Sequence, residues 1–119
     1  MSYQIRKATV DDTALMTDLI FRSKASNGYD AAFMEACRDE LRMTDAKLQQ
    51  AQYWLADDGE LLGTIGLGKK AGSTGEITTM FVAPEAKRRG IGQALWRVAI
   101  NAAQESGFAR VELDADPAA

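Results

Sequence analysis

The residues best suited to chemistry form a basic, glycine-containing stretch that runs from Val82 to Leu95. Its centre is a Lys-Arg-Arg run at 87–89, which is followed closely by Gly90 and Gly92. Cationic side chains and exposed backbone N–H groups both bind anions, and a helix start adds the positive end of the helix dipole. A helix N-terminus without bulky side chains typically binds phosphate. The spacing therefore predicts a phosphate site here.

The segments on either side predict the elements that position this site. Residues 76–82 form an alternating, largely apolar run, which is typical of a strand, and Pro84 ends it because proline donates no ladder hydrogen bond. After Gly90, apolar side chains recur at helical spacing, and Gly107 is suited to the C-terminal cap. The sequence thus predicts a strand, a basic turn and an amphipathic helix in succession.

Composition narrows the class of protein. The chain has 119 residues, of which 46% are hydrophobic and 26% charged, so we expect one globular domain over residues 1–119. A net charge of −3 argues against nucleic acid as a partner. No apolar run approaches the length of a membrane span, and the N-terminus lacks a signal-peptide pattern. We therefore expect no membrane partner.

The cysteine and histidine counts exclude several kinds of site. Cys37 is the single cysteine, which excludes an internal disulfide and fits a reducing cytoplasm. The chain contains no histidine, so neither a zinc site nor a Ser-His-Asp triad is expected. We predict a cytoplasmic protein with no metal site.

The rest of the chain predicts further strands and helices. Strands are expected at 3–8, 53–56, 61–68 and 111–114. Helices are expected from Asp11 or Asp12 to about residue 26 and from 30 to 42, with a short turn at 44–48. An Asp-Gly pair at 58–59 predicts a hairpin turn, and residues 71–75 predict a longer loop. The expected buried stripes are Ala14, Leu15, Leu19 and Ile20 in the first helix, and Phe33, Met34, Cys37 and Leu41 in the second.

The stretch V-x-P-x-x-K-R-R-G-I-G-x-A-L resembles the acetyl-CoA signature of the GCN5-related N-acetyltransferase (GNAT) family, whose core is R/Q-x-x-G-x-G/A. Lys87 stands where that family prefers Arg or Gln, whereas Gly90 and Gly92 match. The predicted order β-α-α-β-β-β-α-β is also similar to the family fold. The resemblance implies an α/β domain whose mixed, mostly antiparallel sheet is flanked by helices.

The resemblance also implies a reaction. Family members transfer an acetyl group from acetyl-CoA to a primary amine, on a small molecule or a peptide, by direct attack in a ternary complex. In the family the fourth and fifth strands splay apart and the pantetheine arm lies in the gap. The cofactor-binding residues implied here are Met80, Phe81, Val82, Lys87, Arg88, Arg89, Gly90, Ile91, Gly92 and Gln93.

Some family members use a glutamate on the fourth strand as general base, and Glu76 occupies the matching place. The alternative for Glu76 is a solvated carboxylate at a strand end. Acidic residues of the second helix offer a further hypothesis, since they would attract a cationic amine, although they equally suit a solvated helix face. These residues are Asp30, Glu35, Asp39 and Glu40.

The resemblance departs from the family pattern at the C-terminus. Residues 113–118 resemble the point where members continue into Ala-x-x-Phe-Tyr, a further helix that carries a catalytic tyrosine, and two final strands. The chain as given ends before that segment, so we expect an exposed edge on the fifth strand, which invites homodimer formation. The alternative function is a non-catalytic acyl-CoA-binding or dimerisation module.

Overall fold

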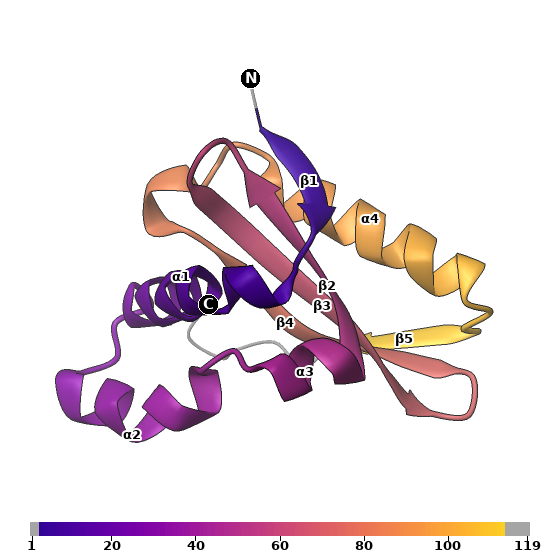
Figure 1. Ribbon diagram of the computed structural model, residues 1–119, viewed down its shortest axis with the longest axis horizontal. Coiled ribbons are helices and arrows are strands. Elements are labelled where there is room, and N and C mark those ends of the chain that lie inside the picture. The colour runs from indigo at the N-terminus through magenta and orange to yellow at the C-terminus, as the bar shows by residue number, and fades with distance from the viewer. Residues whose placement is uncertain (1–2, 114–119) are drawn as a thin grey trace.

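The computed structural model describes residues 3–113, which fold around one five-stranded sheet (Figure 1). The strands are β1 (Gln4–Lys7), β2 (Ala51–Asp57), β3 (Leu61–Ala71), β4 (Thr74–Val82) and β5 (Arg110–Leu113). They lie in the order β1-β2-β3-β4-β5. Neighbours pair antiparallel except β4 and β5, which are parallel. The predicted mixed, mostly antiparallel sheet is confirmed.

Helices cover both faces of this sheet. Before β2 come a 3-10 turn (Val10–Asp12), α1 (Thr13–Ala25), α2 (Ala31–Leu41) and α3 (Asp45–Gln50). After β4 come a second 3-10 turn (Pro84–Ala86) and α4 (Ile91–Glu105), which lies behind the sheet in the view of Figure 1, with α1 and α3 in front. Among the described residues, no helix is long and apolar enough to cross a membrane.

The core forms on both faces of β3, the central strand. All seven residues from Leu61 to Leu67 are buried, as expected of a strand that is covered on each side. Two of them are glycines, which leave room for neighbours: a Cβ on Gly63 would meet Ile91 Cγ2 of α4 at 3.0 Å. The largest fully buried side chains include Met16, Leu19, Leu55, Ile65, Leu67, Ile91 and Leu95.

The predicted buried stripe of the first helix is partly wrong. Leu19 and Ile20 are buried, but Ala14 and Leu15 are exposed, and Met16 lies in the core instead. Ala14 and Leu15 lie outside the buried stripe of α1, whose members follow the helical spacing i, i+3, i+4 and i+7: Met16, Leu19, Ile20 and Ser23. Asp12 does not cap α1 through its side chain.

The carboxylate of Asp12 is used in a buried ion pair. It accepts hydrogen bonds from Arg6 Nη1 and Nη2 at 2.9 Å, and from the backbone N–H of Thr9 at 2.8 Å. Arg6 Nε also donates to Asp57 Oδ2 at 3.0 Å. The Arg6 guanidinium lowers the pKa of Asp12 to about 2. This pair joins β1, the first turn and β2.

The second helix also differs from its prediction. Met34 is buried, but Phe33 is 42% exposed and stacks on Tyr29, with ring centroids 4.4 Å apart. Cys37 and Leu41 are only half-buried. Since α2 packs against α1 and not against the sheet, only one of its four predicted apolar positions reaches the interior.

Strands β2, β3 and β4 are longer than predicted, β1 is shorter, and one connection is shorter. The residues expected to form a long loop at 71–75 are a tight turn at Gly72-Ser73, because β3 extends to Ala71 and β4 begins at Thr74. Gly72 has a φ of +53°, which favours glycine. Of the predicted last strand, Val111, Glu112 and Leu113 are confirmed within β5, whereas residue 114 lies outside the described residues.

Candidate functional site

Strand β5 pairs in parallel with the beginning of β4, from Thr74 to Ile77. Their parallel pairing ends where Ile77 of β4 meets Leu113 of β5. Strand β4 continues to Val82 and stays paired with β3 over this stretch. Within the described residues, the segment from Thr78 to Val82 therefore has one paired edge and one open edge. An open edge offers backbone N–H and C=O groups to an extended ligand.

A β-bulge marks β4 at the point of separation. Strand β3 pairs Gly66 with Thr79 and then Leu67 with Ile77, so Thr78 has no partner in this ladder. Bulges bend a strand and redirect its side chains, and they occur often beside active sites. The bulge at Thr78 thus follows directly after the last residue that joins β4 to β5.

The predicted phosphate site is formed by the loop before α4 and by the first turn of that helix. Gly90 is the N-cap residue, with a φ of +77°, and no side chain among residues 3–113 caps the helix start. Arg88 also has a left-handed φ of +69°. A Cβ added to Gly90 would meet no heavy atom within 4 Å. The helix start is therefore open and uncapped, as a phosphate site requires.

A cavity of about 840 Å³ joins the open edge of β4 to this helix start. Most of the predicted cofactor residues line it, but Arg89, which is exposed, is not among them. Glu76 does not line this cavity either. The predicted residues that the cavity brings together are Met80, Phe81, Val82, Lys87, Arg88, Gly90, Ile91, Gly92 and Gln93.

The end of α1 holds the basic loop in place. Arg22 of α1 forms an ion pair with Glu85 of the second 3-10 turn, with Nη1 3.3 Å from Oε2. Lys87 Nζ donates to Ser26 Oγ at 3.4 Å. The backbone N–H of Glu85 and the Arg22 side chain both hold the pKa of Glu85 below its usual range. These contacts fix the loop while leaving the Lys87 ammonium exposed at the cavity.

A second cavity, of about 500 Å³, is lined by residues of α1 to α3 and of strands β2 to β4. It shares Thr78, Thr79 and Phe81 of β4 with the first cavity. Glu76 is half-buried and lines this second cavity. Within the described residues, the Glu76 carboxylate forms no hydrogen bond or ion pair, so it is available to a ligand.

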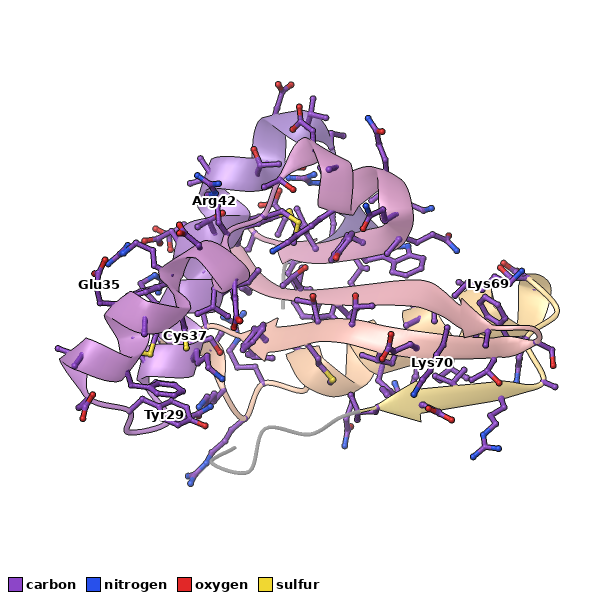
Figure 2. All side chains as sticks on the ribbon, turned by 90° about the horizontal axis from the view of Figure 1, so that it is seen from below. Tyr29, Glu35, Cys37, Arg42, Lys69 and Lys70 are labelled. Atoms are coloured by element: carbon purple, nitrogen blue, oxygen red, sulfur yellow. The ribbon has the colours of Figure 1, made fainter. Side chains whose placement is uncertain are left out.

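The acidic residues of the second helix separate into different positions. Asp30 caps α2 by accepting a backbone N–H at 2.8 Å. Glu35 pairs with Arg38 at 3.2 Å and lies on the outer side of the helix (Figure 2), and Asp39 is exposed. Glu40 lines the second cavity. Of these four residues, Glu40 is the one that the structure places beside Glu76 in a common cavity.

Several lining residues were not predicted as site residues, among them Ser23, Asn27 and Tyr53. Ser23, which is 5% exposed, and Asn27 contribute the α1 side of the first cavity. Tyr53 of β2 is 6% exposed and lines the second cavity. The sequence indicated only a turn at Asn27 and a strand at Tyr53. Side chains that reach a site from a distant element carry no local signal in the sequence.

Comparisons with known proteins agree with this geometry. Residues 14–119 match the family model described as "Acetyltransferase (GNAT) family". A stretch of 52 residues is 46% identical to the peptidyl-lysine N-acetyltransferase YiaC of Escherichia coli K12. That match covers 43% of this chain and 33% of YiaC, so it spans about a third of that protein's length.

Solved structures show the same fold. The PaiA N-acetyltransferase of Thermoplasma acidophilum, crystallised with coenzyme A, has a TM-score of 0.81 at 20% identity, over 98% of this chain and 81% of that one. A GCN5-related N-acetyltransferase from Ralstonia eutropha JMP134 has a TM-score of 0.79 at 27% identity, over 98% and 85%. The chain belongs to the acetyltransferase (GNAT) family, whose acetyl donor is acetyl-CoA.

Proposed function

We propose that this protein transfers the acetyl group of acetyl-CoA to a primary amine. The observation that carries the proposal is the continuous cavity that runs from the open edge of β4 to the uncapped start of α4. Its two ends offer different chemistry, with an open strand edge at one and a cationic, glycine-containing helix start at the other. Such a cavity suits a ligand with an amide-containing arm and a pyrophosphate.

We assign protein groups to the pantetheine arm and to the pyrophosphate of acetyl-CoA from the hydrogen bonds and charges that each part requires. The open edge of β4 at residues 80–82 would pair with the amides of the pantetheine arm, as an added strand does. The pyrophosphate would lie over the backbone N–H groups at the start of α4, with the ammonium of Lys87 and the guanidinium of Arg88 adding charge. The open space beside Gly90 fits this placement. Arg89 is exposed beside this loop and would act through its charge.

The acceptor would react from the second cavity, which shares Thr78, Thr79 and Phe81 with the first. The neutral amine nitrogen attacks the carbonyl carbon of the thioester, forming a C–N bond as the C–S bond breaks. The nitrogen then releases a proton to solvent to give the amide, and the electron pair of the C–S bond stays on sulfur, which takes a proton from solvent. We assign Glu76 as the base that removes a proton from the incoming ammonium, directly or through water. Its place in the second cavity and its unpaired carboxylate support this role.

A lysine side chain is the acceptor to test first. The relative YiaC is named for peptidyl-lysine acetylation. The second cavity has an apolar wall that would contact the methylene stem, and its charged lining combines two lysines, Lys47 and Lys69, with two carboxylates that would attract the ammonium. Its apolar lining includes Ile20, Leu41, Met43 and Phe81, and its carboxylates are Glu40 and Glu76.

The test is acetylation of a panel of amines by the purified protein. Released coenzyme A thiol would be followed with lysine peptides, simple alkylamines and amino acids, each with acetyl-CoA. We expect acetyl-CoA-dependent thiol release with at least one lysine-containing acceptor, and a mass increase of one acetyl group on the product. Saturable acetyl-CoA binding without acetylation of any amine would instead support the alternative, a non-catalytic acyl-CoA-binding module.

Homodimer formation is a second proposal, and it rests on the outer edge of the sheet. Within the described residues, β5 pairs only with β4, and Leu113 is 45% exposed. Unpaired strand edges favour association. Sedimentation of the chain across a range of concentrations tests this: a single monomeric species at every concentration would reject it. We also propose a reducing, cytoplasmic setting, on the evidence of the lone and half-buried Cys37.

A further inference from the structure

Tyr53 of β2 is a buried residue whose hydroxyl has no hydrogen-bond partner in the described chain. The residue is 6% exposed, and its hydroxyl forms no hydrogen bond within residues 3–113. Leaving a buried hydroxyl unsatisfied is costly, and native proteins rarely do so. Among the described residues, no side-chain nitrogen or oxygen that is sealed from solvent lacks a partner. The Tyr53 hydroxyl is therefore open to the second cavity, which the residue lines.

The ring of Tyr53 lies across β3 toward β4. Tyr53 is the register partner of Gly66, and a Cβ on Gly66 would meet Tyr53 Cε2 at 2.6 Å and Cδ2 at 2.9 Å. The same Cβ would meet Thr78 Oγ1 at 2.6 Å. The outer edge of the ring and the Thr78 side chain thus lie together above the glycine. Only a residue without a side chain allows this crossing.

This position brings the ring to the reaction end of the proposed cofactor site. Thr78 is the bulged residue of β4 and follows Ile77, where the pairing with β5 ends. Thr78 also lines both cavities. With the ring edge beside Thr78 and its hydroxyl open to the second cavity, Tyr53 would meet an acceptor that approaches the acetyl group through that cavity.

Neither Lys47 nor Glu76, two charged residues of the second cavity, can by itself orient the N–H groups of an acceptor amine. Lys47 Nζ donates to the backbone carbonyls of Glu40 and Arg42 at 2.7 and 2.6 Å, so it is already used within the fold. The Glu76 carboxylate can take one proton of an ammonium group but cannot by itself orient the remaining N–H groups. A neutral phenol oxygen accepts such an N–H without adding charge.

We propose that Tyr53 orients the acceptor, its hydroxyl accepting a hydrogen bond from the amino group of a primary amine on an unbranched alkyl stem. The inference rests on the proposed acetyl transfer and adds a residue from a strand that the signature does not include. The phenol keeps its proton throughout. Replacement of one N–H by a methyl group removes a donor and crowds the oxygen, so Tyr53 selects primary over N-methyl amines.

The test compares Tyr53→Phe with Tyr3→Phe. The first change removes one oxygen and leaves the ring above Gly66. The second is the same chemical change at a residue just before β1, and β2 and β3 lie between β1 and β4 in the sheet. The probes are a blocked lysine methylamide and its Nε-methyl derivative, with acetyl-CoA affinity measured by calorimetry. We expect Tyr53→Phe to lose about tenfold or more in kcat/KM for the primary amine.

Two further readouts separate orientation from mere structure. Tyr53→Phe should bind acetyl-CoA as the wild type does and should lose the preference for the primary over the N-methyl amine, whereas Tyr3→Phe should retain both activity and preference. A folded Tyr53→Phe protein with unchanged kcat/KM and unchanged preference would overturn the inference while leaving acetyl transfer intact. A wild-type protein that acetylates no amine would overturn the proposed function, and this inference with it.

Discussion

Ile77 of β4 pairs with Leu113 of β5, and no later residue of β4 pairs with β5 among residues 3–113. Both residues line the larger cavity, and Leu113 is the last residue of the chain that the structure describes. The bulge at Thr78 comes next in β4. The open edge of β4, the bulge and the helix start together line a cavity that the local sequence signature alone does not show.

The start of α4 can be tested at Gly92. A Cβ at this position would meet Met80 Cε at 3.6 Å and Val82 Cγ2 at 3.7 Å, which is ordinary contact. Gly92→Ala should therefore bind acetyl-CoA nearly as the wild type does. Gly92→Glu places bulk and negative charge over the helix start, and we expect it to lower affinity by at least tenfold in calorimetric titration. Equal acetyl-CoA affinities for Gly92→Ala and Gly92→Glu would show that the phosphate does not bind at this helix start.

Lys87 should contribute charge to the same site. Its exposed ammonium lies at the larger cavity, so Lys87→Met should weaken acetyl-CoA binding by about tenfold at low salt. The loss should shrink as ionic strength rises, because exposed charges are screened. Arg97→Met, on an exposed position of α4 that lines neither cavity, is the matched control. An identical loss in both variants would indicate a general charge effect.

Glu76 should affect turnover and not cofactor binding. Glu76→Gln keeps the size of the side chain and removes the base, so kcat should fall by about a hundredfold, within the usual range for general base catalysis. The affinity for acetyl-CoA should stay unchanged. The deficit should be smaller at high pH, where more of the amine is already neutral. An unaltered pH–rate profile would show that Glu76 is not the general base and is a solvated carboxylate instead.

Gly66 should be required for the position of the Tyr53 ring. In Gly66→Ala, the new Cβ would lie 2.6 Å from both Tyr53 Cε2 and Thr78 Oγ1, so at least one of these side chains must move. We expect a loss of amine acetylation larger than that of Tyr53→Phe, with some loss of stability. Gly68→Ala is the milder comparison, since its Cβ would meet Thr78 Cγ2 at 3.3 Å. Full activity in Gly66→Ala would show that the ring position is unimportant.

The buried ion pair of Arg6 and Asp12 should make stability depend on pH. The pKa of Asp12 falls from an ordinary value of 3.8 to about 2 in the folded chain, so the pair stabilises above pH 3.8 and is lost as pH falls toward 2. Asp12→Asn should lower the free energy of unfolding by about 2 kcal/mol at pH 7. Urea unfolding at pH 7 and near pH 2.5 measures this.

A control for that experiment is Asp11→Asn, at the exposed neighbouring position. Its stability should match the wild type at both pH values. The difference between wild type and Asp12→Asn should fall to about a third near pH 2.5, because the Asp12 carboxylate is then largely protonated in the unfolded chain and partly protonated in the folded one. A difference that does not change with pH would mean that Asp12 acts by packing and not by its charge.

The fold was largely predictable because its signals are local. Strand alternation, the Asp-Gly pair at 58–59 and the apolar spacing after Gly90 each determine an element within a few residues, and all of them are found. The predicted faces of the first two helices were less accurate. The buried stripe of α1 includes Met16 and leaves Leu15 exposed, and α2 packs mainly against α1, with Phe33 exposed.

The candidate site likewise has one part that the sequence predicted and one part that only the structure shows. The signature from Lys87 to Gln93 is contiguous, and the structure gathers most of it around one cavity. Ser23, Asn27 and Tyr53 come from α1, the turn after it and β2, and only the folded chain brings them to β4. Their partners depend on register and on the bulge at Thr78, which no local pattern indicates.

The central claim is that the start of α4 binds the pyrophosphate of acetyl-CoA. Calorimetric titration of the 119-residue chain with acetyl-CoA, and separately with pantetheine, which lacks every phosphate, tests it most directly. We predict saturable binding of acetyl-CoA, at least a hundredfold weaker binding of pantetheine, and loss of this difference in Gly92→Glu. Equal binding of both ligands, or no binding of acetyl-CoA by the folded chain, would contradict the claim.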